Sequence, residues 1–132
     1  DLNKYSYFVD YLGHTNNVKE YLEKSSIFVL PSYYREGLPR SIMEAMATGR
    51  AIITTNNVGC KETVIDNYNG FLIPVKNIEK LAEKMEYFII NTNKIISMGE
   101  NSRKLCEERF NCNRINQIIL NIIEGKEFAI PN

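Results

Sequence analysis

Two glutamates, Glu36 and Glu44, lie within the stretch REGLPRSIMEAMATG (residues 35–49), with seven residues between them. A helical pattern covers residues 40–48, with Ile42, Ala45 and Met46 on one face, so Glu36 precedes the helix and Glu44 lies inside it. Pro39 suits a helix start, because the amide hydrogen that it lacks has no intrahelical partner there. The free amides and the dipole of a helix start favour anions such as phosphate. Three more residues at this end favour binding through close backbone approach or hydrogen-bond donation, namely Gly37, Arg40 and Ser41.

The positions of the two carboxylates suggest different partners. Glu44 lies roughly 7 Å along the helix from Pro39, at about 1.5 Å per residue, which is close to the distance from a diphosphate to the adjoining ribose. Glu36 lies on the other side of the phosphate position and could accept hydrogen bonds from the hydroxyls of a sugar. The spacing therefore suggests a nucleotide-sugar site. Two structural alternatives stay open: a solvated Glu36, and a Glu44 that favours the helix dipole or pairs with Arg40.

The elements that position these residues alternate between strands and helices, which predicts an α/β fold with a Rossmann-like parallel sheet and helices on both faces. Apolar and β-branched runs predict strands at residues 5–12, 27–31, 51–55 and 71–75, and the continuous apolar run at 27–31 suits a strand that is covered on both faces. Helical patterns follow Asn16 or Asn17 and recur at residues 40–48, 78–89, 94–109 and 112–124, with helical turns within 61–70 and a turn at Asn69–Gly70. Ligands of such sheets bind beyond the carboxyl ends of the strands, where the loop after residues 27–31 lies.

Two of these helices carry apolar side chains at helical spacing. The repeats are Ile78, Leu81, Ala82, Met85 and Ile89 in one, and Ile115, Ile118, Ile119, Ile122 and Ile123 in the last. We expect the last stripe to pack into a core, and the alternative is that it drives self-association.

Composition narrows the function further. The chain has 132 residues, and its 16 basic and 16 acidic side chains cancel, which argues against a general nucleic-acid binder. Three cysteines, Cys60, Cys106 and Cys112, lack metal-type spacing and suggest reduced thiols in a cytoplasmic protein. The sequence shows neither a signal peptide nor an apolar run long enough to span a bilayer.

The segment PSYYREGLPRSIMEAMATGRAIITTNNVGCKETVIDNYNGFLIPV (residues 31–75) resembles the carboxyl-terminal donor-binding domain of the family 4 retaining glycosyltransferases, which have the GT-B fold. The resemblance extends over about residues 5–110, and Glu36 and Glu44 match the E-x7-E motif of that family. The sequence is similar to the bacterial branch that builds capsule, O-antigen and lipid-linked glycans. Residues 1–132 would then be a nucleotide-sugar-binding domain.

The resemblance also implies roles for individual residues. Glu36 would be the catalytic residue that faces the donor sugar, and Glu44 would hold the ribose. The backbone amides of Gly37, Leu38, Arg40 and Ser41 would bind the sugar and the diphosphate. His14 and Thr15 would line the base pocket, although a surface loop is an equal alternative for His14. Glu62 matches a recurrent glutamate of the family, and the first turn of a short helix is an equal alternative.

Two departures from the family bear on activity. The resemblance predicts an amino-terminal acceptor domain and two earlier strands, with an Arg and a Lys that bind the diphosphate. Compared with the family, this sequence starts after the positions of both. We therefore expect a fragment that is inactive alone. Arg35, Arg40 and Lys61 could replace part of the missing charge.

The complete enzyme would transfer a hexose or N-acetylhexosamine, from a uridine donor, to a glycan or lipid-linked acceptor with retention of configuration. It would need neither a metal nor a cofactor, and it could associate peripherally with the inner face of the membrane. The alternatives are a non-catalytic binding or assembly module of the same fold, and a nucleotide-sugar epimerase.

Overall fold

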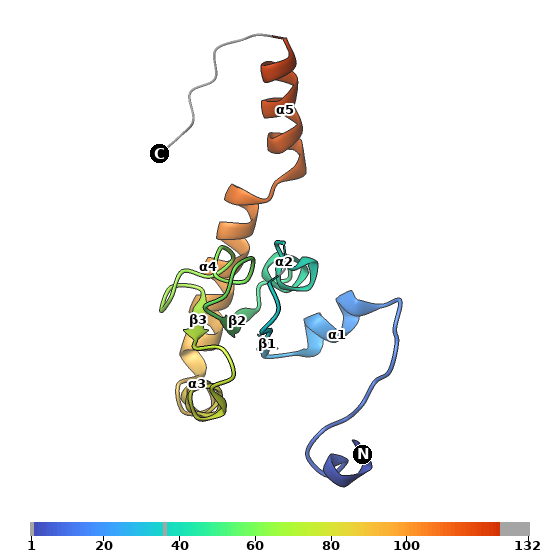
Figure 1. The fold of residues 1–132 in the computed structure, drawn as a ribbon, viewed down its shortest axis with the longest axis vertical. Helices are drawn as coiled ribbons and strands as arrows, with labels where there is room; N and C mark the ends of the chain where they lie inside the picture. Colours follow the sequence, from blue (N-terminus) through green and yellow to red (C-terminus); the bar gives the residue numbers. More distant parts are fainter. Residues whose placement is uncertain (1, 36, 125–132) are drawn as a thin grey trace.

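A three-stranded parallel sheet forms the centre of the computed structural model, which describes residues 2–35 and 37–124. The strands are β1 (Ile27–Leu30), β2 (Ala51–Thr55) and β3 (Gly70–Ile73), in the spatial order β1-β2-β3 (Figure 1). Ile27 pairs with Ala51, and Ile53 pairs with Phe71. The predicted α/β class with parallel strands is confirmed.

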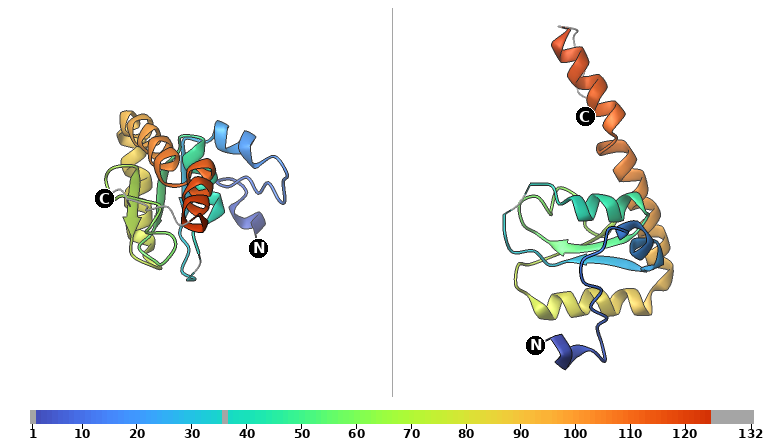
Figure 2. Two further views of the ribbon diagram at one scale, coloured as in Figure 1. Left: turned by 90° about the horizontal axis from the view of Figure 1, so that it is seen from above. Right: turned by 90° about the vertical axis from the view of Figure 1, so that its right-hand side faces the viewer.

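Helices cover both faces of this sheet, as expected. Helix α2 (Arg40–Ala47) lies on one face and α3 (Ile78–Ile90) on the other, as Figure 2 shows. Helix α4 (Thr92–Arg109) runs beside the sheet from the level of α3 to that of α2 and is followed by α5 (Cys112–Ile123), which extends away from the sheet. Before β1 come a short 3-10 helix (Leu2–Tyr5) and α1 (Val18–Lys24).

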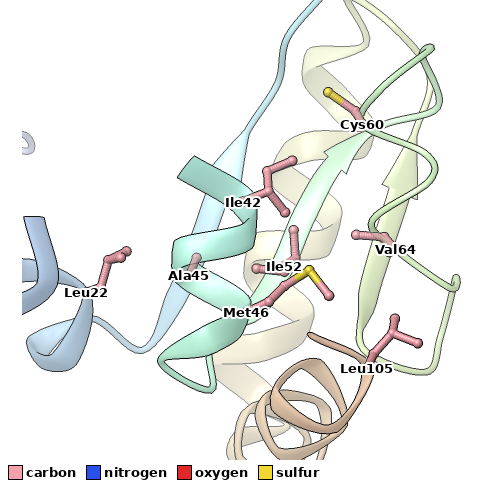
Figure 3. Packing of buried hydrophobic residues seen from close by; sticks show 8 residues of the cluster. All are labelled: Leu22, Ile42, Ala45, Met46, Ile52, Cys60, Val64 and Leu105. Carbon is pink, nitrogen blue, oxygen red and sulfur yellow. The ribbon is translucent and has the colours of Figure 1, made fainter. Parts of the chain in front are cut away.

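Each face of the sheet has its own apolar core. Ile42, Ala45 and Met46 of α2 are fully buried together with Ile52, which confirms the predicted inner face of that helix (Figure 3). On the opposite face, Phe88 of α3 packs in a cluster that includes Ile53, Phe71 and Met98. Because β2 lies between two strands and two helical layers, all five of its residues are buried.

Helix α4 approaches the amino ends of β2 and β3 very closely. A Cβ atom on Gly99 would overlap the carbonyl oxygen of Gly49, so the contact requires a glycine. Next to it, the buried Asn69 accepts a hydrogen bond from the Ile65 amide (2.8 Å), and its own carbonyl accepts one from the Ser102 hydroxyl (3.1 Å). These buried polar groups are paired, as burial requires.

The turn predicted at Asn69–Gly70 lies earlier in the chain, so its predicted position is wrong. The turn covers residues 67–69 and begins at Asn67, which has a positive φ of 63°. Asn69 is buried, and Gly70 already belongs to β3.

The predicted strand at residues 5–12 is also wrong. Leu2–Tyr5 forms a 3-10 helix, and residues 6–12 form no strand. A strand needs a partner for its backbone groups, and no described segment pairs with this one. Its large side chains are exposed, with 90% of Tyr7 and 82% of Phe8 accessible. The described sheet therefore has three strands instead of four.

Burial differs from expectation at three other elements. β1 has one neighbouring strand and is half-buried, whereas we expected cover on both faces. In α3, Ile78 and Ile89 are each 76% exposed, because the helix turns Phe88 toward the sheet instead. The stripe of α5 is not core either, since α5 has no buried residue. No described helix is long and apolar enough to cross a bilayer.

The start of β3 gives a direct test of this packing. A Cβ on Gly70 would overlap the carbonyl of Ile52, which is backbone and cannot move aside. We expect Gly70→Ala to lower the free energy of unfolding by more than about 2 kcal/mol, in the upper range for overpacking. Gly37→Ala is the control, because nothing lies within 4 Å of its added methyl group. Urea unfolding measures both, and equal stabilities of the two variants would contradict the packing.

Candidate functional site

Three loops meet at the carboxyl edge of the sheet, where a ligand is expected. They comprise residues 31–39 after β1, 56–65 after β2 and 74–77 after β3. The described residues of these loops and of the first turn of α2 carry the exposed cations Arg35, Arg40, Lys61 and Lys76. Their acidic residue is Glu62. The described residues of this edge therefore carry an excess of positive charge, which favours an anionic ligand.

The amino end of α2 points into this edge. The helix begins at Arg40, with Pro39 as the N-cap residue rather than the first helical residue, and no side chain of residues 2–35 or 37–124 caps it. The Pro39 carbonyl accepts the amides of Ile42 (3.1 Å) and Met43 (3.2 Å). The first turn contains no acidic side chain. The positive end of the helix dipole is therefore available to an anion.

Side chains at the end of β2 and just after it hold β1 and the loop that leads to α2. The hydroxyls of Thr54 and Thr55 donate to the carbonyls of Leu30 (2.8 Å) and Ser32, and the side-chain amide of Asn57 donates to the carbonyl of Tyr34 (2.8 Å). The bonds from Thr55 and Asn57 continue the β1–β2 contact beyond the end of β1. Sequence reasoning missed this role, for which the only signal is the polar run TTNN at residues 54–57.

Two tyrosines and a lysine also meet at this edge. The Tyr33 hydroxyl donates to that of Tyr34 (2.7 Å), and this bond, with a smaller effect of burial, raises the pKa of Tyr33. The ammonium group of Lys76 lies 4.9 Å from the centroid of the Tyr33 ring, a cation–π distance. Lys76 has a positive φ of 59°, which is uncommon for a residue with a Cβ. A cavity of about 300 Å³ opens beside Tyr33 and Lys76.

Glu44 lies on an exposed part of α2 and faces a second cavity, of about 480 Å³, between α1 and α2. Asn16, Asn17 and Arg103 line the same cavity. No ion pair joins Glu44 to Arg40 in the described part of the chain, which removes one of the structural alternatives. The carboxylate is therefore available to a ligand.

The other predicted site residues are placed as follows. Glu36 lies outside the described residues, so its role and the E-x7-E assignment stay predictions. Gly37 and Leu38 are exposed in the loop, and Ser41 is half-buried in the first turn of α2. His14 is exposed, and the Thr15 hydroxyl accepts the amide of Asn17 (3.0 Å). Neither His14 nor Thr15 lines the cavity beside Glu44, whereas Asn16 and Asn17 do.

The structure gives Glu62 a local role. Its carboxylate accepts the amide of Gly59 (2.7 Å), which has a positive φ of 89°. This hydrogen bond closes the loop after β2, where residues 58–63 form a turn in place of the short helix that was the structural alternative for Glu62.

A larger cavity, of about 790 Å³, lies at the opposite, amino edge of the sheet, where both acidic and basic side chains line it. The described residues contain no group of three or more His, Cys, Asp or Glu side chains that could hold a metal ion.

A parallel α/β sheet with a free helix start and several cations at its carboxyl edge is typical of nucleotide-binding domains. The chain belongs to the glycosyl transferases group 1 family, whose model matches residues 4–105. Over 94 residues it is 36% identical to the N,N'-diacetylbacillosaminyl-diphospho-undecaprenol alpha-1,3-N-acetylgalactosaminyltransferase of Campylobacter jejuni, and the match covers 71% of this chain and 25% of that enzyme.

Two further comparisons agree with this family. Over 101 residues the chain is 33% identical to the UDP-Gal:alpha-D-GlcNAc-diphosphoundecaprenol alpha-1,3-galactosyltransferase of Escherichia coli. This match covers 76% of this chain and 25% of that enzyme. The crystal structure of Anabaena HepE in complex with UDP matches with a TM-score of 0.88 at 24% identity, over 94% of this chain and 35% of that one. The solved structures that share the fold of this chain are GT-B glycosyltransferase domains. The chain spans about a quarter of the length of these curated relatives.

Substitution of the two described glutamates near the site, Glu44 and Glu62, should change the free energy of unfolding by different amounts. Glu62→Gln weakens a charge-assisted hydrogen bond to Gly59, and we expect it to lower the free energy of unfolding by about 1 kcal/mol. Glu44→Gln alters an exposed carboxylate and should change it by less than about 0.5 kcal/mol. Thermal unfolding checks both variants, and the reverse order would contradict the assigned contacts.

Proposed function

We propose that the complete protein transfers a sugar from a nucleoside-diphosphate sugar to a glycan or lipid-linked acceptor, and that this chain binds the donor. The observation that carries the proposal is the amino end of α2, which no described side chain caps and which opens among four cations at the carboxyl edge of the sheet. Glu44 follows one turn further along the same helix. A diphosphate at the helix start would place a ribose within reach of that carboxylate.

The same geometry would assist the chemical step. When the bond between the sugar and the diphosphate breaks, negative charge develops on the diphosphate, and preorganised amides and cations stabilise it. Positive charge develops on the sugar carbon, and we assign Glu36 to orienting that sugar. Transfer with retention of configuration is part of the proposal, and we assign no covalent nucleophile.

The donor nucleotide and the acceptor are proposed from the relatives. A uridine donor is supported by the UDP in the HepE structure and by the UDP-Gal in the name of the Escherichia coli relative. The names of two relatives specify acceptors linked to diphospho-undecaprenol. We propose an acceptor of this chemical class in surface polysaccharide biosynthesis, which would bring the complete protein to a membrane surface.

Single substitutions in the complete protein test the assigned roles. Glu44→Gln should raise the dissociation constant for UDP by at least about tenfold, because it weakens two hydrogen bonds from ribose hydroxyls to a charged acceptor. Glu36→Gln should leave UDP binding within about twofold and lower turnover by on the order of a hundredfold, because it misplaces the reacting sugar. Calorimetry with UDP and a sugar-transfer assay measure these effects.

Glu86→Gln is the matched control, since Glu86 is an exposed helical glutamate on α3. It should bind UDP and turn over like the wild type. Unchanged affinity and turnover in both the Glu36 and the Glu44 variants would refute the proposal.

One observation favours a second candidate, an assembly module of the same fold. The stripe of α5 is exposed, with 64% of Ile122 and 75% of Ile123 accessible, and an apolar patch of this kind is typical of an interaction surface. A second copy of the chain is the simplest partner for it.

The assembly candidate predicts a dimer that a charge on α5 disrupts. Ile122→Asp would place a carboxylate in the apolar contact, so a dimer should become a monomer in light scattering at equal concentration. Asn116→Asp adds the same charge to an exposed polar position of α5 and should leave the dimer intact. Dimers of the complete protein together with no binding of UDP would favour this candidate over the transferase, whereas a monomeric wild type would exclude it.

A further inference from the structure

The carboxyl end of α2 is held by two arginines. The carbonyl of Thr48 accepts Nε (3.0 Å) and Nη2 (2.8 Å) of Arg50, and the carbonyl of Ala47 accepts Nη1 of Arg103. The last carbonyls of a helix have no intrahelical partner, and cations there also favour the helix dipole. The two guanidinium groups therefore pair with carbonyls at the carboxyl end of α2, opposite the helix start.

The two arginines differ in how far they lie from α2 in the sequence. Arg50 lies in the connection between α2 and β2, and its Nη1 also reaches the carbonyl of Ser25 (2.7 Å). Arg103 belongs to α4 and lies 56 residues beyond Ala47. Arg103 therefore ties α2 to a helix that is distant in sequence, and the Glu107 carboxylate orients its guanidinium group through a hydrogen bond to Nε (2.6 Å).

Arg103 is part of a stripe on α4 that faces α2 and its last turn. Gly99, Arg103 and Cys106 follow one another at helical spacing and contact α2 or the turn after it. Gly99 meets the carbonyl of Gly49, and the Cys106 thiol donates to the carbonyl of Met43 (3.7 Å). Burial raises the pKa of Cys106, so this thiol keeps the proton that it donates. The stripe fixes the position of α2 relative to α4.

Arg103 also lines the cavity of about 480 Å³ that Glu44 faces. Its contact at Ala47 is one turn along α2 from Glu44, so a shift of that contact would displace the carboxylate directly. We propose that Arg103 is a positioning residue that holds α2, and through it Glu44, in place for the donor nucleoside. This inference rests on the proposed function and adds a residue of α4 that does not touch the reacting atoms.

The test compares donor binding and turnover in the complete protein. Arg103→Gln removes the charge and shortens the side chain, and we expect the dissociation constant for UDP and the KM for the UDP-sugar to rise about fivefold to tenfold. Turnover should stay within about twofold of wild type, because the ribose is bound alike in the ground state and the transition state. Arg103→Lys can still reach the Ala47 carbonyl and should recover most of the affinity.

Two controls separate positioning from a loss of stability. Lys104→Gln removes an exposed charge from the neighbouring position of α4 and should bind UDP like the wild type. Phe88→Leu destabilises the opposite core cluster and should lower the melting temperature without weakening UDP binding. A combination of Arg103→Gln with Glu44→Gln should bind UDP only slightly more weakly than Glu44→Gln alone, because both act on the same contact.

The outcomes distinguish this inference from the function on which it rests. If the wild-type protein binds neither UDP nor a UDP-sugar, the proposed function fails and the role of Arg103 fails with it. If the wild type binds UDP and Arg103→Gln binds it within twofold, only the role of Arg103 is refuted. That role is also refuted if Phe88→Leu, at an equal loss of melting temperature, weakens UDP binding as much as Arg103→Gln does.

Discussion

The packing of α2 against both the sheet and α4 is the constraint on which the rest of the structure depends. Its inner face is fully buried, and its last carbonyls bond to Arg50 and Arg103. Because a helix is stiff over two turns, fixing one end and one face also fixes the direction of the other end. The negative end of its dipole lies beside the guanidinium groups of Arg50 and Arg103, while the positive end opens at the carboxyl edge of the sheet.

The polar groups around the site fall into two sets with different roles. Side chains that hold the loops bond to the backbone, as Asn57 does with Tyr34 and Glu62 with Gly59. The cations at the edge are exposed, and Glu44 faces a cavity. The chain belongs to the glycosyl transferases group 1 family, and in the function that we propose for it these cations and the amides of α2 would stabilise a leaving diphosphate.

Features that depend on local signals could be predicted from the sequence. Pro39 and the apolar spacing of Ile42, Ala45 and Met46 located the start and the inner face of α2, and the buried run at residues 51–55 located the central strand. The strand expected at residues 5–12 depended on a partner that no described segment supplies. Distant contacts, such as that of Arg103 with Ala47, leave no pattern in the sequence, and neither does the exposure of a helical stripe.

A crystal structure of the complete protein with a bound nucleoside-diphosphate sugar would show directly whether α2 holds the donor. We predict that the diphosphate lies against the amides of Arg40 and Ser41, and that the ribose hydroxyls lie about 2.6–3.2 Å from the carboxylate oxygens of Glu44. A donor bound elsewhere, with the amino end of α2 and Glu44 both facing solvent, would contradict this role of the helix.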